Sequence, residues 1–170
     1  MSLIPKSKKL FEITVRNLIF GAEDSLVSTV GLISGIAIAG IPRSSILLSG
    51  IILLFVEAFS MAAGSFLSER GTEEIVERKD LPLSYPLLGG VIMFASYLVS
   101  GFIPLLPYFL TDVSQAFKIS IILSLIALFL LGALSAKKFG VPPIKSGIRM
   151  LVIGGAAIAL GILVGNIFKV

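Results

Sequence analysis

The stretch SSILLSGIILLFVEAFSMAAGSFL, Ser44 to Leu67, decides the fold class of this chain. It is long enough to cross a bilayer as a helix, which takes about 20 predominantly apolar residues. Its one charged side chain, Glu57, lies in its second half. A charge within the bilayer costs roughly 2.5–3.5 kcal/mol on insertion scales, so it normally faces a bundle interior, a water-filled path or a bound cation. The stretch therefore predicts a membrane helix with an acid that has a function.

The whole chain has the composition of an integral membrane protein. Of its 170 residues 56% are hydrophobic and 14% charged, whereas soluble domains have about 25% charged residues. Five apolar segments predict an all-α, single transmembrane domain, with a short acidic connection at residues 69–86. They cover about residues 18–41, 44–67, 87–106, 117–136 and 148–168. The eight prolines, Pro104 and Pro107 among them, lie at or near the proposed ends, where proline costs least.

The basic residues predict the orientation of these segments. Eleven Lys and Arg side chains flank one side, in residues 6–16, 70–79 and 137–149. Three flank the other side: Arg43, Lys118 and Lys169. Because loops rich in Lys and Arg stay in the cytosol, we expect the N-terminus inside and the C-terminus outside.

Four side chains of the first two segments are candidate metal ligands: Glu23, Asp24, Glu57 and Met61. A rise of about 1.5 Å per residue places Asp24 about 12 Å, Glu57 about 16 Å and Met61 about 10 Å from the cytosolic ends of their segments. Glu57 and Met61 are four residues apart and share a helix face. Glu23 and Asp24 point about 100° apart, so we assign Asp24 to the site and Glu23 to its edge.

The chain has no histidine and no cysteine, so a metal site must use carboxylate, carbonyl, hydroxyl or thioether groups. Such ligands suit Fe²⁺, Mn²⁺, Mg²⁺ or Ca²⁺, and a thioether favours Fe²⁺ among these. Clustered carboxylates repel one another in a low dielectric, and either a divalent cation or protons relieve that repulsion. This is a physical basis for exchange. The alternative interpretation is that Glu57 bonds to a serine or a backbone carbonyl and that Met61 fills the core.

Two further patterns allow two interpretations each. Small residues spaced by four, such as Gly31 with Gly35 and Gly161 with Gly165, allow close helix packing within one subunit or between two. The acids of the connection at residues 69–86 indicate either a solvated extension of the second helix or a surface that gathers cations.

Two stretches resemble the vacuolar iron transporter family, which includes the yeast calcium cross-complementer-type iron and manganese carriers. They are GAEDSLVSTVGLISGIAIAG (Gly21–Gly40) and AFSMAAGSFLSE (Ala58–Glu69). The ending PPIKSGIRMLVIGGAAIALGILVG (Pro142–Gly165) is similar to that family's final span. The resemblance implies a homodimer with a metal path between its subunits, lined by the first two helices. It matches Asp24 to the family's first-span aspartate and Met61 to its second-span methionine.

The sequence departs from the family pattern at several positions. Ser25 replaces the usual glycine after the aspartate, Asn17 stands where plant members have a further acid, and Ser65 replaces a common glutamate. Glu57 lies one turn before Met61, whereas the family's second-span acid lies about two turns before it. The connection at residues 69–86 is much shorter than the metal-collecting helical domain of plant and parasite members, which implies weaker metal capture.

The resemblance implies a carrier that exports Fe²⁺ or Mn²⁺ from the cytosol in exchange for protons, and the buried acids agree with it; the metal is then the substrate, and no permanently bound cofactor is expected. The expected partners are a second copy of the chain and membrane lipid, not nucleic acid. The compact form favours a prokaryotic plasma membrane. An enzyme is disfavoured, because the chain has no phosphate-binding glycine loop. The alternatives are a scaffold or metal-responsive regulator without transport, and a carrier of another cation.

Overall fold

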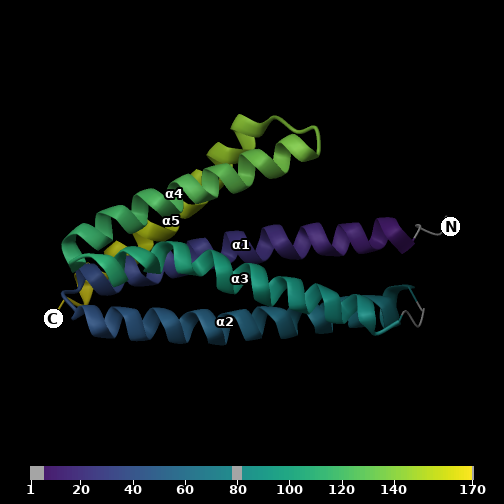
Figure 1. The fold of residues 1–170 in the computed structure, drawn as a ribbon, viewed down its shortest axis with the longest axis horizontal. Coiled ribbons are helices and arrows are strands. Elements are labelled where there is room, and N and C mark those ends of the chain that lie inside the picture. Colours follow the sequence, from purple (N-terminus) through teal and green to yellow (C-terminus); the bar gives the residue numbers. More distant parts are fainter. Residues whose placement is uncertain (1–5, 78–81, 170) are drawn as a thin grey trace.

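The computed structural model describes residues 6–77 and 82–169, and every regular element in these ranges is helical. Five helices are long and apolar enough to cross a membrane. They are α1 (Lys6–Ile38), α2 (Arg43–Gly71), α3 (Ser84–Leu110), α4 (Val113–Lys138) and α5 (Pro143–Ile167), and a π-helical segment, η1 (Thr72–Glu77), continues α2. The helices run alternately between the two ends of the bundle (Figure 1). The prediction of an all-α chain with five such helices is confirmed.

Two of the eight prolines contradict the expectation that they mark helix ends. Pro104 and Pro107 lie inside α3, which continues to Leu110. A proline within a helix removes a backbone donor, yet proline is more frequent in membrane helices than in helices of soluble proteins. Here the Ser120 hydroxyl of α4 donates to the Pro104 carbonyl at 2.7 Å, and the Thr111 hydroxyl donates to the Pro107 carbonyl at 3.1 Å.

The acidic connection begins as a direct extension of α2. The helix continues beyond the expected span to Gly71, and η1 follows it without a break. Within this part Arg70 forms an ion pair with Glu74 at 2.6 Å, an i,i+4 pair along the helix surface. Two further acids of the connection, Glu73 and Glu77, would share a helical face with Glu74, because Glu77 follows the other two at spacings of four and three, and their side chains lie outside the described residues.

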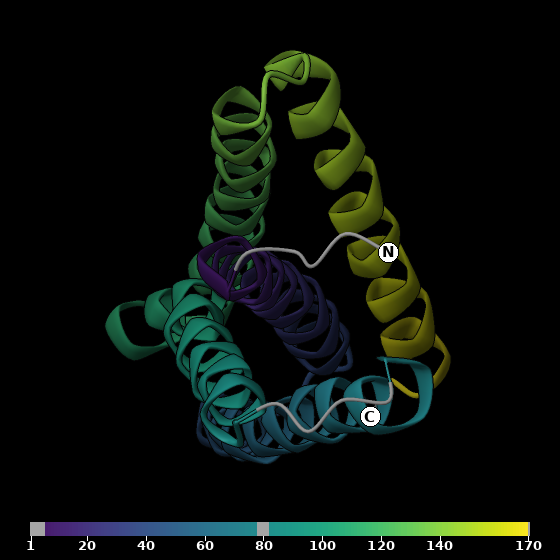
Figure 2. The same cartoon turned by 90° about the vertical axis from the view of Figure 1, so that its right-hand side faces the viewer.

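Helix α1 lies at the centre of the bundle. Figure 2 looks along it from its N-terminal end and shows the other four helices around it. The core forms where α1, α2 and α3 meet, and α4 adds Ala116. It contains the fully buried side chains Ile33, Leu54, Tyr97 and Tyr108. Because α1 contacts every other membrane helix, its side chains face either a helix neighbour or a groove between two neighbours.

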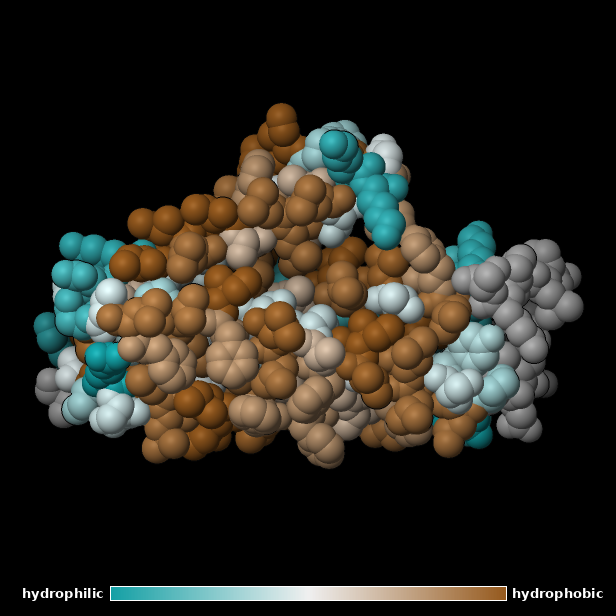
Figure 3. Space-filling view, in the orientation of Figure 1, coloured by the Kyte–Doolittle hydropathy of each residue, from teal (hydrophilic) through white to brown (hydrophobic). Residues whose placement is uncertain are grey.

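The outer surface has the hydrophobic pattern of a membrane protein. In Figure 3 the middle of the visible face is hydrophobic, and hydrophilic residues gather toward its ends. Large apolar side chains are exposed on several of the helices, as with Phe59 of α2 at 71% and Leu110 of α3 at 73%. A soluble monomer rarely exposes a continuous apolar surface of this kind, so lipid is the solvent that fits it.

The glycines of α1 and α5 pack against each other within one chain. A Cβ atom on Gly35 of α1 would lie 2.7 Å from the Gly161 carbonyl oxygen of α5, and one on Gly165 would overlap the Gly35 carbonyl. The backbones of α1 and α5 therefore touch. Gly64 of α2 has no atom near enough to contact an added Cβ.

Candidate metal path between helices α1 and α2

Asp24 of α1 and Glu57 of α2 are membrane acids that interact with one another from two different helices. The two carboxyl groups are close enough to interact electrostatically, and both residues are half-buried. Asp24 shares its helix face with Ser28 and Leu32, which follow at intervals of four. The structure thus brings together the two acids that depth along the helices had placed in one layer.

None of the three membrane acids has a protein partner within the described residues. Neither a hydrogen bond nor an ion pair links Glu23, Asp24 or Glu57 to another group in that part of the chain. The alternative interpretation, in which Glu57 bonds to a serine or a carbonyl, is therefore not what the structure shows. Buried charges are normally paired, bound to metal or neutralised by a proton, so these carboxylates are candidates to bind a cation or protons.

One chain supplies an incomplete set of ligands. Among residues 6–77 and 82–169 no three acidic side chains converge closely enough to hold a metal ion. Glu23 interacts with Asp24, its neighbour in sequence, and is half-buried like it. The pair that the fold itself creates, from two separate helices, is Asp24 with Glu57.

Glu57 borders a hollow of about 330 Å³ that lies toward the C-terminal end of α1. Leu32 of α1 and Ser49 and Val56 of α2 also line it. Met61 lines a different hollow, which lies on the other side of the acids, toward the N-terminal end of α1. This N-terminal cleft has a volume of about 590 Å³, and its walls include Arg16, Asn17, Ser65 and Met93. The Asp24–Glu57 pair therefore lies between two hollows that follow the α1–α2 contact.

Met61 combines the two roles considered for it. Its half-buried side chain packs against the hydrophobic core cluster, and it also lines the N-terminal cleft. It lies one helical turn from Glu57 on the same face of α2. A second thioether, that of Met93 from α3, lines the same cleft.

A layer of hydroxyl groups next to the acids was not predicted from the sequence. The Ser28 hydroxyl hydrogen-bonds the Tyr97 hydroxyl at 2.7 Å, and the Ser25 hydroxyl donates to the Tyr97 carbonyl at 2.6 Å. The buried Tyr97 phenol is within electrostatic reach of both Asp24 and Glu57. The place of Ser28 beside Asp24 could have been predicted from the sequence, because residues four apart share a helix face. Tyr97 had no such signal, because α3 lies in a segment without charged residues.

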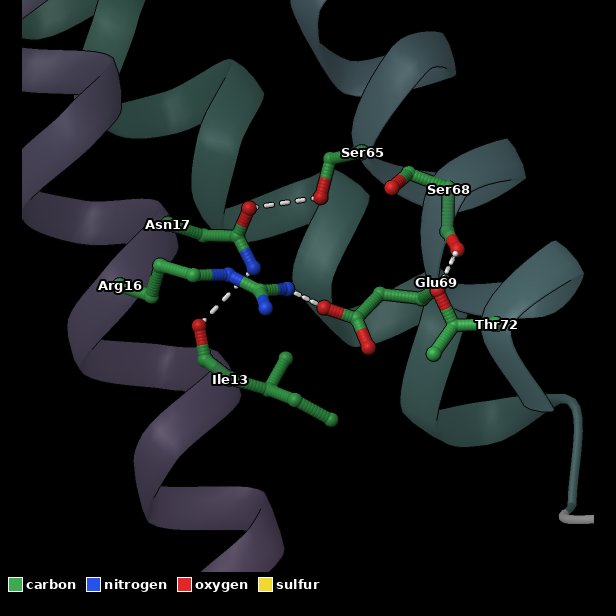
Figure 4. Close-up of polar contacts among 7 residues, drawn as sticks. All are labelled: Ile13, Arg16, Asn17, Ser65, Ser68, Glu69 and Thr72. Carbon is green, nitrogen blue, oxygen red and sulfur yellow. Dashed lines mark hydrogen bonds and ion pairs between the residues drawn. The ribbon is translucent and has the colours of Figure 1, made fainter. Parts of the chain in front are cut away.

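Figure 4 shows the polar contacts at the N-terminal end of the α1–α2 contact. Arg16 forms an ion pair with Glu69. The Ser65 hydroxyl donates to the Asn17 amide oxygen at 2.6 Å, and the Asn17 nitrogen donates to the Ile13 carbonyl at 2.9 Å. Asn17 and Ser65 are two positions at which the sequence departs from the pattern it resembles, and in space they are direct partners.

Comparison with known proteins decides the family. A sequence model described as "VIT family" matches residues 15–83 and 76–166, nearly the whole chain. The chain belongs to the VIT family. The chain is 26% identical over 205 positions to vacuolar iron transporter 1 of Tulipa gesneriana, an alignment that covers 85% of this chain and 83% of that protein. It is 28% identical over 159 positions to vacuolar iron transporter homolog 2 of Arabidopsis thaliana, covering 86% and 80%.

Membership of the VIT family fits the geometry in two respects. The matched segments contain all four candidate ligands and most of each of the five helices long enough to span a membrane, so the chain is a multi-pass membrane protein. The two matches meet at residues 76–83, in the connection between α2 and α3. The aligned part of this chain is too short to fill the 205 positions of the tulip alignment, so the tulip protein has residues that this chain lacks.

Proposed function

We propose that this VIT-family chain is a carrier of divalent metal, Fe²⁺ or Mn²⁺, which it exports from the cytosol in exchange for protons. The observation that carries the proposal is the Asp24–Glu57 pair, half-buried between two membrane helices and without a partner in the described residues. The names of the relatives, vacuolar iron transporter and its homologs, support iron as a substrate and transport rather than catalysis.

Exchange follows from the electrostatics of two carboxylates in a low dielectric. With both ionised and no cation present, they repel each other and lack solvation. A divalent cation removes both costs, and protons do the same after the metal has left. Met61, one turn from Glu57 on the same face, offers a thioether that binds Fe²⁺ better than Mg²⁺ or Ca²⁺. The protein then alternates between a metal-bound and a protonated site.

We infer that the functional unit is a homodimer. A single chain contributes two interacting carboxylates, and no third acid converges on them among the described residues. A second copy related by two-fold symmetry would double the set and enclose the hollows along the α1–α2 contact. The excess of Lys and Arg at the N-terminal end of the bundle supports a cytosolic location for that end, and the compact chain favours a prokaryotic plasma membrane.

Flux of Fe²⁺ and Mn²⁺ into proteoliposomes, measured with and without a pH gradient, tests the proposal. We expect flux that a pH gradient drives, and we expect Asp24→Asn and Glu57→Gln to abolish it. Glu12→Gln is the matched control, because Glu12 is an exposed acid of α1 outside the apolar segment, and its flux should equal that of the wild type. Competition by Zn²⁺, Ca²⁺ and Mg²⁺ measures selectivity.

The same assay separates this function from the other candidates. A scaffold or metal-responsive regulator would bind metal without any flux. A carrier of another cation would show flux that Fe²⁺ and Mn²⁺ do not compete for. Met61→Leu keeps the apolar volume that packs against the core and removes only the thioether, so it should lower the preference for Fe²⁺ while the protein remains folded.

A further inference from the structure

One ion pair joins α1 to α2 at the N-terminal end of the metal path, and its two members differ sharply in exposure. The Arg16 side chain is 62% exposed, whereas the Glu69 side chain is only 8% exposed. Figure 4 shows the guanidinium reaching from α1 toward the carboxylate of α2. The arginine can therefore leave the pair for solvent, but the carboxylate stays where it is.

This ion pair adjoins the N-terminal cleft through Arg16, while Glu69 lies behind the arginine and is not one of the residues that line the cleft. Arg16 itself forms part of the cleft wall, beside the hydroxyls of Ser65 and Ser68. Deeper in the cleft, Phe20 and Met61 lie on its walls, and each is four residues from one of the acids: Asp24 on α1 and Glu57 on α2. The cleft walls thus come within one helical turn of both acids, although neither acid lines the cleft itself.

A fixed positive charge is an unexpected group at the mouth of a cation path. The contact between the helices does not depend on it, because the Ser65–Asn17 hydrogen bond already joins α1 and α2 one turn away. An ion pair whose arginine is mostly exposed is also weak support for stability, since solvent screens the attraction between the two charges. The position of this ion pair is therefore not explained by stability alone, and the uneven exposure of Arg16 and Glu69 suggests that the arginine can be displaced.

We propose that Glu69, with the hydroxyl groups of Ser65 and Ser68, is the first binding site for the divalent cation, and that Arg16 is a tethered competitor for it. This proposal rests on the proposed function. Without metal, the guanidinium neutralises the carboxylate and closes the cleft mouth. A divalent ion carries twice the charge and binds hard oxygen ligands, so it displaces the arginine into solvent. The cation then enters the N-terminal cleft, between Arg16 and Met61.

The sign of the effect of each substitution tests this competition. In proteoliposomes, Glu69→Gln should raise the KM for Mn²⁺ about tenfold, the equivalent of losing one charged ligand. Arg16→Gln should lower the KM several-fold, because the competitor is gone. The double variant Arg16→Gln/Glu69→Gln should behave as Glu69→Gln does. Glu74→Gln is the matched control: it removes a carboxylate from an exposed ion pair little more than one turn away, and its KM should not change.

A purely structural ion pair gives a different pattern. Both single variants would then impair transport in the same direction, and the double variant would restore it; that pattern overturns the proposal. An unchanged KM in Arg16→Gln overturns it as well. If Glu69→Gln does not fold, judged by size-exclusion chromatography, the direction of the Arg16→Gln change still decides.

Equilibrium binding keeps this test independent of transport. Mn²⁺ bound to the detergent-solubilised full chain is measured from the loss of the free-ion electron paramagnetic resonance signal. Absence of flux in the wild type would overturn the proposed function. The binding variants would still support the Glu69 site if Arg16→Gln tightens Mn²⁺ binding and Glu69→Gln weakens it, and would overturn it if neither affinity changes.

Discussion

Replacing Gly161 with alanine should force α5 away from α1. The added Cβ would overlap the Gly31 carbonyl oxygen, which is a backbone atom and moves only with its helix. The reciprocal change, Gly35→Ala, places a Cβ 2.7 Å from the Gly161 carbonyl oxygen, whereas Cβ atoms almost never approach within 3.0 Å. The helices must therefore separate by a few tenths of an ångström for Gly35→Ala and by more for Gly161→Ala.

Gly155→Ala is a matched control on the same helix, because nothing lies within 4 Å of the added Cβ. Alanine improves helix propensity by about 1 kcal/mol at either position, so the comparison cancels that gain. The remaining difference is the cost of overpacking, about 1–3 kcal/mol. At roughly 2–4 °C per kcal/mol for a chain of this length, the Tm of Gly161→Ala should lie about 2–12 °C below that of Gly155→Ala.

Circular dichroism at 222 nm, followed during heating of the purified protein in detergent, measures these midpoints. The expected order of Tm, from lowest to highest, is Gly161→Ala, Gly35→Ala, Gly155→Ala. Equal midpoints for Gly161→Ala and Gly155→Ala would refute the close α1–α5 packing. They would also return these glycines to the other interpretation, contact between subunits.

Two further substitutions test the ends of the helices. The Arg43 guanidinium donates to the Tyr108 and Phe109 carbonyls at the end of α3. Arg43→Ala should therefore lower the free energy of unfolding by about 1–3 kcal/mol, because charged hydrogen bonds are lost, and thermal unfolding measures this change. Arg43→Lys should retain part of the stability, because lysine keeps the charge but has fewer directed donors. The Asp112 carboxylate accepts hydrogen bonds from the Ser114 and Gln115 amides as the N-cap of α4. Asp112→Ala should therefore lower stability by about 0.5–2 kcal/mol, and Asp112→Asn should cost much less, since asparagine caps as well; a larger loss for the asparagine variant would contradict the capping role.

Helical periodicity and depth along each helix predict only part of the candidate site. A rise of about 1.5 Å per residue is enough to place Asp24 and Glu57 in one layer, and the structure brings these two carboxyls within electrostatic reach. Tyr97 could not be found in this way, because its place beside the acids depends on how α3 packs against α1. The Arg16–Glu69 pair has the same origin, since more than fifty residues of chain separate its members.

The prolines show a limit of local rules. Pro104 and Pro107 predict the end of a helix, because proline lacks a backbone donor. They nevertheless lie within α3, where the Ser120 and Thr111 hydroxyls bond the prolines' own carbonyls. The Ser120 hydroxyl comes from the next helix, so local sequence signals at the prolines do not reveal it.

The sequence by itself determined the helical class, the five apolar segments and the acids within two of them, because the length of an apolar run and its charge content depend only on the order of residues. Tertiary structure decided which polar groups meet. It paired Asp24 with Glu57, placed Arg16 against Glu69, and used the glycines of α1 and α5 for contact within the chain. Lipid gives every apolar helix face nearly the same environment, so hydrophobicity fixes that a helix spans the membrane but not which neighbour it touches. That choice comes from small residues and polar contacts, which act only once the helices are side by side.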